Sequence, residues 1–234
     1  MKWIQRLIIT KLLFWTSAIA AQENKTEVHD PKNSLPGIYD EKLNAFRSEA
    51  TVPGQIVFLG NSITMGGDWK NLLKNSLVLN RGIGGDITYG VLQRLSEVTD
   101  RHPALLFILI GINDIGRDIP VVDILTNYRR IIEKVSQDSP ETRIHVFSIL
   151  PVNPTVPNFI KSYDKNDVVL EVNRQLQQMS KQYKIKYIDL HKILANKDGL
   201  LHSDLTKDGL HLNSEGYKIW AEYILKNQWV VPNF

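Results

Sequence analysis

The sequence of 234 residues contains no cysteine. This absence excludes disulfide bonds, zinc–thiolate sites, iron–sulfur clusters and cysteine nucleophiles. The sequence also lacks a strong excess of positive or negative charge, with 28 Lys and Arg against 25 Asp and Glu. Three of the basic residues, and none of the acidic ones, lie in the first 21 positions. The rest of the chain is neutral, which argues against a nucleic-acid-binding or polybasic membrane-surface protein. A hydrophobic content of 43% and a charged content of 23% are typical of a globular domain.

The first 21 residues have the layout of a secretory signal peptide. Lys2 and Arg6 precede an apolar stretch that Lys11 interrupts, and small residues close it. The interruption leaves fewer clean apolar residues than the ~20 that a spanning helix needs. We therefore expect cleavage and export to the periplasm or the medium, with an uncleaved N-terminal anchor as the alternative. Residues 22–38 are polar and indicate a linker, and no membrane span is expected in the mature chain.

Short apolar runs alternate with amphipathic patterns in the rest of the chain. The expected strands are 56–59, 77–79, 104–110, 144–150 and 186–189. The expected helices cover residues 39–46, 91–98, 121–135, 168–183 and 217–225, at helical spacing of apolar residues. Thr88 and Asn213 are the candidate N-caps of two of these helices. The alternation predicts one α/β domain with a parallel sheet covered on both faces, and places a ligand site beyond the carboxyl ends of the strands.

Polar residues follow three of the expected strands. Ser62 follows the first, next to Gly60, where a helix start offers backbone N–H groups to a nucleophile that develops negative charge. Asn113 follows the third, where its amide could donate to an oxyanion. Read singly, the serine is more typical of a helix N-cap, and the asparagine of an Asx turn or cap.

The second strand leads into a glycine-rich turn. Gly82, Gly84 and Gly85 lack the G-x-G-x-x-G spacing of a dinucleotide site and follow the wrong strand for it. The turn either lets the backbone approach a ligand closely or simply leads into a helix.

A candidate base lies near the C-terminus. Asp208 stands three residues before His211 on an expected loop, where a carboxylate can fix the imidazole tautomer and leave the other ring nitrogen as a base. His202 lacks a close preceding acid, and His191 lies near the fifth strand, where a structural role is more typical. A nucleophile, an oriented base and oxyanion donors at one sheet edge together predict acyl-transfer chemistry.

These residues resemble the SGNH hydrolases, also called the GDSL esterase/lipase family. The resemblance rests on four blocks in order, residues 58–64, 80–88, 111–114 and 208–211. It implies a flavodoxin-like three-layer α/β/α sandwich with a central parallel sheet of about five strands, formed by residues 39–234. It also implies an esterase without metal or cofactor. The sequence is most similar to the platelet-activating-factor acetylhydrolase-like and carbohydrate acetylesterase branches.

The resemblance also implies roles for single residues. Ser62, Asp208 and His211 would form the catalytic triad, and Ser62, Gly85 and Asn113 the oxyanion hole. The sequence departs from the family at Asn61, where an Asp is usual. This departure puts the local loop order and the pH dependence in question, but not the reaction class.

The expected function is hydrolysis of short-chain acetyl esters, carried by a carbohydrate. A lysophospholipase or thioesterase is the alternative enzyme, and a non-catalytic glycan-binding domain of the same fold is a third possibility. Phe159 and Tyr163, in the long connection after the fourth strand, could stack on a sugar or anchor that loop. Arg81 and Arg117 could pair with a substrate carboxylate or be solvated surface. The sequence predicts a small-molecule or glycan ester as the partner and no nucleic acid, and leaves the oligomeric state open.

Overall fold

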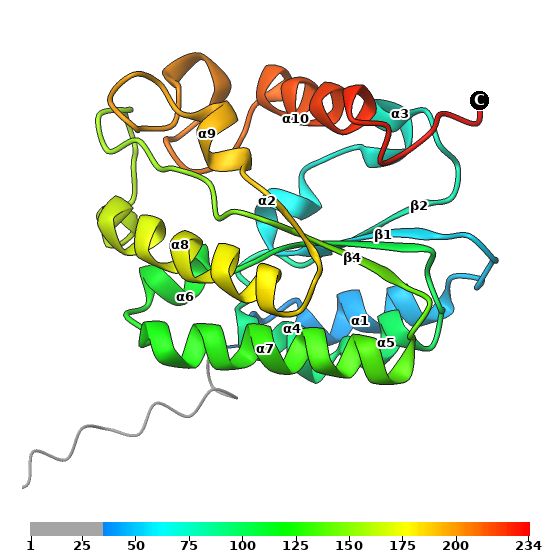
Figure 1. The fold of residues 1–234 in the computed structure, drawn as a ribbon. Coiled ribbons are helices and arrows are strands. Elements are labelled where there is room, and N and C mark those ends of the chain that lie inside the picture. Colours follow the sequence, from blue (N-terminus) through cyan, green and yellow to red (C-terminus); the bar gives the residue numbers. More distant parts are fainter. Residues whose placement is uncertain (1–34) are drawn as a thin grey trace, which may run out of the picture. The chain divides into compact units, whose positions relative to one another are not determined.

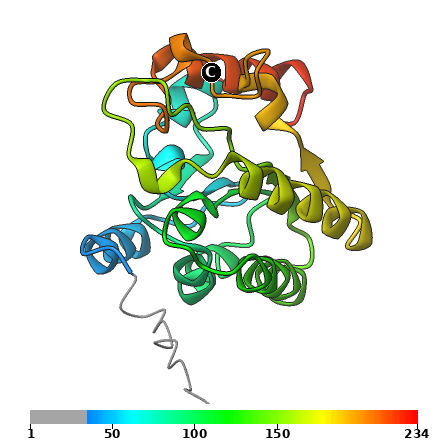
Figure 2. The same ribbon diagram turned by 90° about the vertical axis from the view of Figure 1, so that its left-hand side faces the viewer.

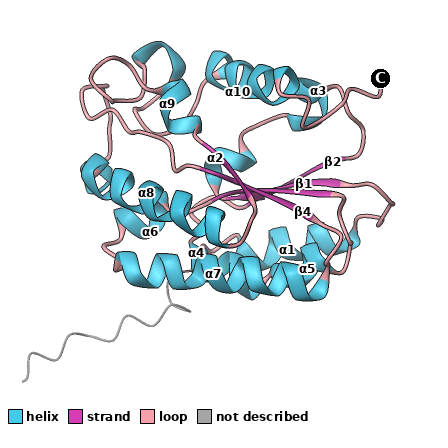
Figure 3. Cartoon of the chain, viewed as in Figure 1, coloured by secondary structure: helices cyan, strands magenta, loops and turns pink. Residues whose placement is uncertain are grey.

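The structure, a computed structural model, describes residues 35–234. The predicted signal peptide and most of the predicted linker lie outside the described residues. A parallel sheet forms the centre of the fold (Figures 1 and 3). It has five strands in the order β2-β1-β3-β4-β5. The strands are β1 (Ile56–Gly60), β2 (Val78–Gly82), β3 (Leu105–Leu109), β4 (Arg143–Phe147) and β5 (Lys186–Ile188). The five strands expected from apolar runs are therefore confirmed.

The strand order creates the place where a site can form. β1 is paired with β2 on one side and with β3 on the other, and both β1 and β3 are buried along their whole length. The chain leaves β1 toward β2, whereas β3 continues toward β4 on the opposite side. Connections that diverge in this way leave room beyond the carboxyl ends of the two central strands. Figure 2 turns this edge of the sheet toward the viewer.

Helices cover both faces of the sheet, so the fold is a three-layer α/β/α sandwich (Figure 1). α3 (Trp69–Leu73) and α10 (Ser214–Lys226) pack together above the sheet in this view. α1, α4, α5 and α7 lie below it, and α8 packs against α7 and β5. Their bounds are α1 (Tyr39–Ser48), α4 (Thr88–Gln93), α5 (Leu95–Thr99), α7 (Val121–Asp138) and α8 (Asn166–Gln182). Short elements at the carboxyl edge are α2 (Ser62–Met65), α6 (Ile112–Gly116), η2 (Lys161–Tyr163), α9 (Leu190–Leu194) and η3 (Ser203–Leu205).

An aromatic cluster fastens the upper helices to the sheet. The ring of Trp69 stacks on Phe58 of β1 with 4.3 Å between centroids, and Trp220 of α10 meets Trp69 edge-on at 4.5 Å. Phe107 of β3 lies against Phe58 at 4.6 Å. Such pairs contribute about 0.5–1.5 kcal/mol each beyond the area they bury, so the cluster fixes the two helices that flank the site.

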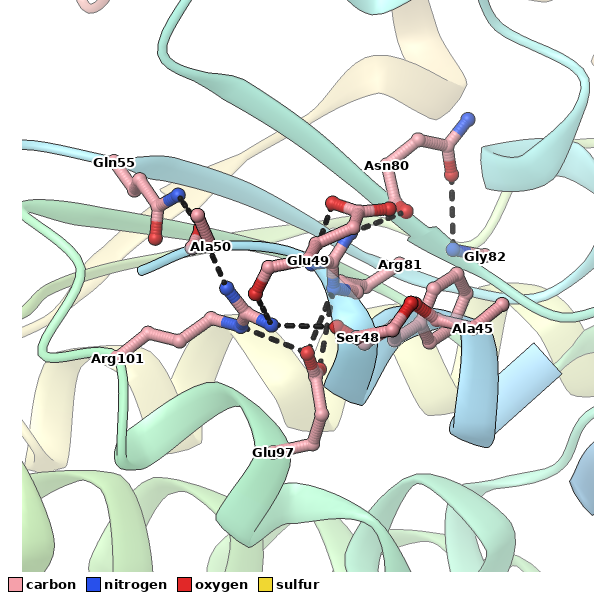
Figure 4. Close-up of polar contacts among 11 residues, drawn as sticks. Ala45, Ser48, Glu49, Ala50, Gln55, Asn80, Arg81, Gly82, Glu97 and Arg101 are labelled. Atoms are coloured by element: carbon pink, nitrogen blue, oxygen red, sulfur yellow. Dashed lines mark hydrogen bonds and ion pairs between the residues drawn. The ribbon is translucent and has the colours of Figure 1, made fainter. Parts of the chain in front are cut away.

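A buried charge cluster fastens α1 to the other side of the sheet (Figure 4). Arg81 of β2 is almost fully buried and bonds Glu97 of α5 through Nε at 3.1 Å and Glu49 through Nη2 at 3.0 Å. Arg101 bonds the same Glu97 at 2.8 Å and donates to the carbonyl of Phe46, at the end of α1. Arg81 is therefore a structural residue. Both expectations for it, pairing with a substrate carboxylate and a place on the solvated surface, are wrong.

Of the two predicted helix N-caps, one is confirmed and one is wrong. Asn213 is the N-cap of α10, and its side chain accepts from the backbone N–H groups of Glu215 and Gly216. Thr88 is not a cap, because Ile87 holds that position and the Thr88 hydroxyl donates to Asp114 instead. Within residues 35–234, none of the helices combines the length and apolar character needed to cross a bilayer.

Candidate active site

Ser62 lies at the first position of α2, directly beyond the carboxyl end of β1. Asn61 is the N-cap, and its Oδ1 accepts from the backbone N–H of Ile63 at 3.0 Å. This bond uses the side-chain oxygen that the family's usual Asp would also offer. The Asn61 Nδ2 is buried and has no hydrogen-bond partner among the described residues. The replacement thus keeps the cap and removes a negative charge beside the serine.

Three side chains bind the carbonyl groups of the short helix that carries Ser62. Tyr217 donates to the carbonyl of Ile63 at 2.7 Å, and the indole N–H of Trp69 donates to that of Thr64 at 2.8 Å. Asn80 Nδ2 lies 3.0–3.1 Å from the carbonyl oxygens of Thr64 and Met65 and of Gly67 just beyond the helix, and its two N–H bonds are shared among these three acceptors. Because carbonyl groups at a helix end have no partner within the helix, these contacts hold the serine in place. The sequence reasoning missed all three, and only the position of Asn80 at a strand end pointed to it.

The loop before α10 carries the acid and the base. Asp208 Oδ1 accepts from the backbone N–H of His211 at 2.7 Å and of Leu210 at 3.0 Å, while Oδ2 meets His211 Nδ1 at 2.8 Å. Burial would raise the pKa of Asp208, but these hydrogen bonds outweigh it and lower the pKa below its usual value. The carboxylate is therefore ionised at neutral pH and holds the imidazole with its Nδ1 protonated.

The conformation of this loop depends on a glycine. Gly209 has a φ of +82°, and a Cβ there would collide with the carbonyl oxygen of Asn153 and approach the ring of Phe159 to 2.8 Å. Thr206 Oγ1 accepts from the Gly209 N–H at 2.9 Å and donates to the carbonyl of His211 at 2.7 Å. The ring of Phe159 therefore lies beside Gly209 in this loop. Stacking of Phe159 on a sugar stays a prediction.

The structure brings Ser62, His211 and Asp208 into one hydrogen-bonded chain. Ser62 Oγ lies 2.9 Å from His211 Nε2, the ring nitrogen that Asp208 does not contact. The rival histidines lie elsewhere: His202 is exposed and its Nδ1 accepts from the backbone of Asp204. His191 is buried in α9, and burial lowers its pKa. Of the three candidates, only His211 has both the serine and the acid within reach.

The glycine-rich turn after β2 lies against the helix of the serine. Gly82 has no room for a Cβ, because the backbone of Met65 would meet it, and the N–H of Ile83 donates to the carbonyl of Gly60 at 3.1 Å. Gly85 has a φ of +77°, a conformation that favours glycine. No described residue accepts a hydrogen bond from the backbone N–H of Gly85 or of Ser62. Both N–H groups are therefore available to a ligand.

Asn113 of α6 is tied to the same turn. Its Nδ2 donates to the carbonyl of Asp86 at 2.8 Å, and its Oδ1 accepts from the hydroxyl of Tyr163 at 3.0 Å. One of the two Nδ2–H bonds is used in this way, so a second remains for a ligand. Arg117 Nη2 donates to the carbonyl of Gly85 at 2.8 Å, so this arginine lies beside the turn.

Two buried carboxyl groups support the turn, and the sequence reasoning assigned them no role. Asp86 forms an ion pair with Arg94 at 3.0 Å, yet burial raises its pKa to about 6. Asp114 accepts from the backbone N–H of Thr88 at 3.1 Å and from its hydroxyl. Burial raises the pKa of Asp114 to about 7. In both cases desolvation of the charged form outweighs the hydrogen bonds.

Among residues 35–234 there is no group of three or more His, Asp or Glu side chains that could hold a metal ion. The described residues of the site form a serine activated by an imidazole, next to backbone and amide donors. This arrangement can attack a carbonyl carbon and bind the resulting oxyanion.

The comparisons with known proteins agree with this chemistry. Residues 58–219 match the model of the GDSL-like Lipase/Acylhydrolase family. The chain belongs to this family, the SGNH hydrolases of the sequence prediction, and it is a serine ester hydrolase.

Three relatives illustrate the range of similarity. Platelet-activating factor acetylhydrolase IB subunit alpha1 of Homo sapiens is 28% identical over 169 residues, which cover 70% of each chain. N-acylneuraminate cytidylyltransferase of Streptococcus agalactiae serotype III is 25% identical over 93% of this chain but only 44% of its own length. A solved structure from Streptococcus pneumonia, provisionally described as a platelet activating factor, is 30% identical with a TM-score of 0.75, over 84% of this chain and 95% of that one.

Proposed function

We propose that the protein hydrolyses short-chain acetyl esters with Ser62 as nucleophile, His211 as general base and Asp208 as the orienting acid. The observation that carries this proposal is the hydrogen-bonded chain from Ser62 Oγ to His211 Nε2 and from His211 Nδ1 to Asp208 Oδ2. Asp208 holds Nδ1 protonated, so Nε2 is free to take the hydroxyl proton as Oγ attacks the ester carbonyl. The imidazolium that forms then lies against the Asp208 carboxylate, which stabilises it.

The developing oxyanion is bound by the N–H groups of Ser62 and Gly85 and by the Asn113 amide. The first two N–H groups have no acceptor among the described residues, and the third has one unused N–H bond. His211 next protonates the leaving alcohol, which departs and leaves an acetyl ester on Ser62. Water, deprotonated by His211, releases acetate and restores the serine. Each oxyanion donor of this kind contributes about 2.7–4 kcal/mol of transition-state stabilisation.

A carbohydrate is the proposed carrier of the acetyl group. The side chains of His211 and Asp208 are about one third exposed, at 36% and 34%. A site as open as this admits a bulky alcohol such as a polysaccharide. The relatives named as acetylhydrolases support acetyl as the acyl group, and the relatives named for N-acylneuraminate support a sugar as the alcohol.

A lipid-type hydrolase is the second candidate, and one feature favours it. Ile38 and Met65 are 40% and 38% exposed, and both approach Gly84 in the turn before the proposed oxyanion donor. A Cβ on Gly84 would lie 3.3 Å from the Met65 methyl group and 3.7 Å from Ile38 Cδ1. This exposed apolar pair could receive an alkyl chain, as in a lysophospholipase or thioesterase.

A chain-length series distinguishes these candidates. The purified protein would be assayed on 4-nitrophenyl esters from acetate to laurate, beside acetylated xylan, acetylated pectin and O-acetylated sialic acid. We expect the highest kcat/KM on acetate and release of acetate from at least one glycan. A preference for acyl groups of about eight carbons or more would contradict the glycan proposal and favour the lipid candidate. Absence of both hydrolysis and fluorophosphonate labelling at Ser62 would favour a glycan-binding domain without activity.

A further inference from the structure

We infer that Tyr163 is a positioning residue of the oxyanion hole, acting through Asn113. The inference rests on the proposed role of Asn113 as an oxyanion donor and adds a residue to that machinery. Tyr163 lies on η2, in the long connection between β4 and α8, 50 residues from Asn113 along the chain. The sequence left open whether it stacks on a sugar or anchors its loop, and its contacts give it a more specific task.

The Asn113 amide is held at both ends. The carbonyl of Asp86 can only accept, so the Asn113 group that meets it at 2.8 Å must be the NH₂ group. The Oδ1 atom then faces Tyr163, whose hydroxyl donates to it at 3.0 Å. Rotation of the amide by 180° would place two oxygens against each other at Asp86. The two contacts together therefore fix one orientation, in which the unused Nδ2–H has a defined direction.

The Tyr163 hydroxyl also strengthens the Asn113 donor. A hydrogen bond to the amide oxygen draws electron density toward it and makes the N–H groups better donors, because neighbouring hydrogen bonds polarise one another. Burial raises the pKa of Tyr163, so its hydroxyl keeps its proton at any pH at which an esterase would act. The side chain is therefore a permanent donor to Asn113.

The backbone around Asn113 is shaped to receive the ring of Tyr163. Gly116 ends the same short helix, and a Cβ at that position would lie 2.5 Å from Cε1 and 2.7 Å from Cδ1 of the ring. Lys165, two residues after Tyr163, donates to the carbonyl of Ile115 at 3.0 Å and to Asp118 at 2.7 Å. The loop is thus fastened to α6 at two points, and the tyrosine hydroxyl reaches Asn113 with little freedom to move.

The test is a double-mutant cycle of Tyr163→Phe and Asn113→Ala on 4-nitrophenyl acetate hydrolysis. Tyr163→Phe keeps the ring and removes one hydroxyl, so we expect kcat to fall about five- to tenfold, the loss of one hydrogen bond, with KM little changed. Asn113→Ala alone should lower kcat about 100-fold. In the Asn113→Ala background, Tyr163→Phe should cause no further loss, because its effect passes through the amide.

Two further variants control the cycle. Tyr183 is the C-cap of α8, and its hydroxyl donates to Glu133 of α7 at 2.6 Å in an exposed contact. Tyr183→Phe removes this hydroxyl and should leave kcat unchanged. Gly116→Ala should lower kcat as Tyr163→Phe does, because the added methyl group displaces the ring while its hydroxyl remains.

Three results would overturn the inference. Additive losses in the double variant would mean that Tyr163 acts on the substrate or on overall structure instead of through Asn113. Unchanged kcat in both Tyr163→Phe and Gly116→Ala would remove any role in turnover. Full activity of Asn113→Ala would overturn the oxyanion role of Asn113 and, with it, this inference. The first two results would leave the proposed function standing.

Discussion

His211 Nε2 lies 2.9 Å from Ser62 Oγ, although the two residues are 149 positions apart in the sequence. The fold makes this contact possible because both residues lie at the same side of the sheet. Ser62 begins the short helix α2 just after β1, and His211 lies on the loop that leads into α10. α10 in turn packs on α3 above the sheet. Tyr217 of α10 joins the two segments a second time, through its hydrogen bond to the carbonyl of Ile63.

Asp208→Asn tests the orienting acid. Asparagine keeps the size of the side chain but can present an N–H to His211 Nδ1, which favours the wrong tautomer. We expect kcat for 4-nitrophenyl acetate to fall by about 10⁴-fold while the protein stays folded. The matched control is Asp204→Asn in the neighbouring η3, whose carboxylate is 83% exposed and which should keep its activity. Equal losses in the two variants would contradict the special role of Asp208.

Glu97→Gln tests the buried charge cluster. The Glu97 side chain is 2% exposed and is shared by Arg81 and Arg101, which are 1% and 5% exposed. The substitution removes the negative charge that Arg81 and Arg101 share in the buried cluster. We therefore expect the free energy of unfolding to fall by about 3–5 kcal/mol. Glu49→Gln, at a side chain 47% exposed in the same cluster, should cost at most about 1 kcal/mol. Urea titrations followed by circular dichroism measure both, and a loss below 1 kcal/mol in Glu97→Gln would be the contrary result.

Asp114 predicts a pH dependence of stability. Its folded-state pKa of about 7 is above its ordinary value, so between about pH 4 and pH 7 the folded state binds more protons than the unfolded state. Stability from this group is therefore full at low pH and is lost as the pH rises toward 7. Between pH 5 and pH 8 the group should lower the free energy of unfolding by roughly 2 kcal/mol.

Asp114→Asn should remove this part of the pH dependence, because its amide does not titrate. Urea titrations at pH 5 and pH 8 would show a smaller difference for Asp114→Asn than for the wild type. Asp123→Asn, at an exposed position near the start of α7, is the control and should keep the wild-type difference. An unchanged difference in Asp114→Asn would mean that the carboxyl group does not titrate in this range.

Much of the fold could be predicted because its information is local. The runs that became β1 and β3 are apolar at every position, since both faces of these strands are buried. Ser62, Gly85 and Asn113 follow the ends of β1, β2 and β3, and that edge is common to all parallel strands. Asn213 could be recognised as a cap because the N–H groups that it binds lie two and three residues further along the chain.

The features that the sequence did not reveal depend on partners far along the chain. Thr88 resembles a helix cap, but Asp114, 26 residues away, takes its hydroxyl. In the sequence Arg81 resembles a solvated surface cation, but in the folded protein it forms a buried ion pair with Glu97. The inferred role of Tyr163 depends on its hydrogen bond to Asn113, and no motif near either residue in the sequence predicts this contact. Local pattern therefore predicts where chemistry lies, and tertiary contacts decide which neighbours support it.

Labelling with a fluorophosphonate probe tests the central claim most directly, because the probe reacts covalently with an activated serine. The wild type should gain one adduct, located by mass spectrometry on the peptide that contains Ser62, and should lose 4-nitrophenyl acetate hydrolysis in parallel. Ser62→Ala should neither react nor hydrolyse the ester, whereas Ser203→Ala, at an exposed serine of η3, should do both as the wild type does. An adduct on another residue, or full hydrolysis by Ser62→Ala, would contradict the account.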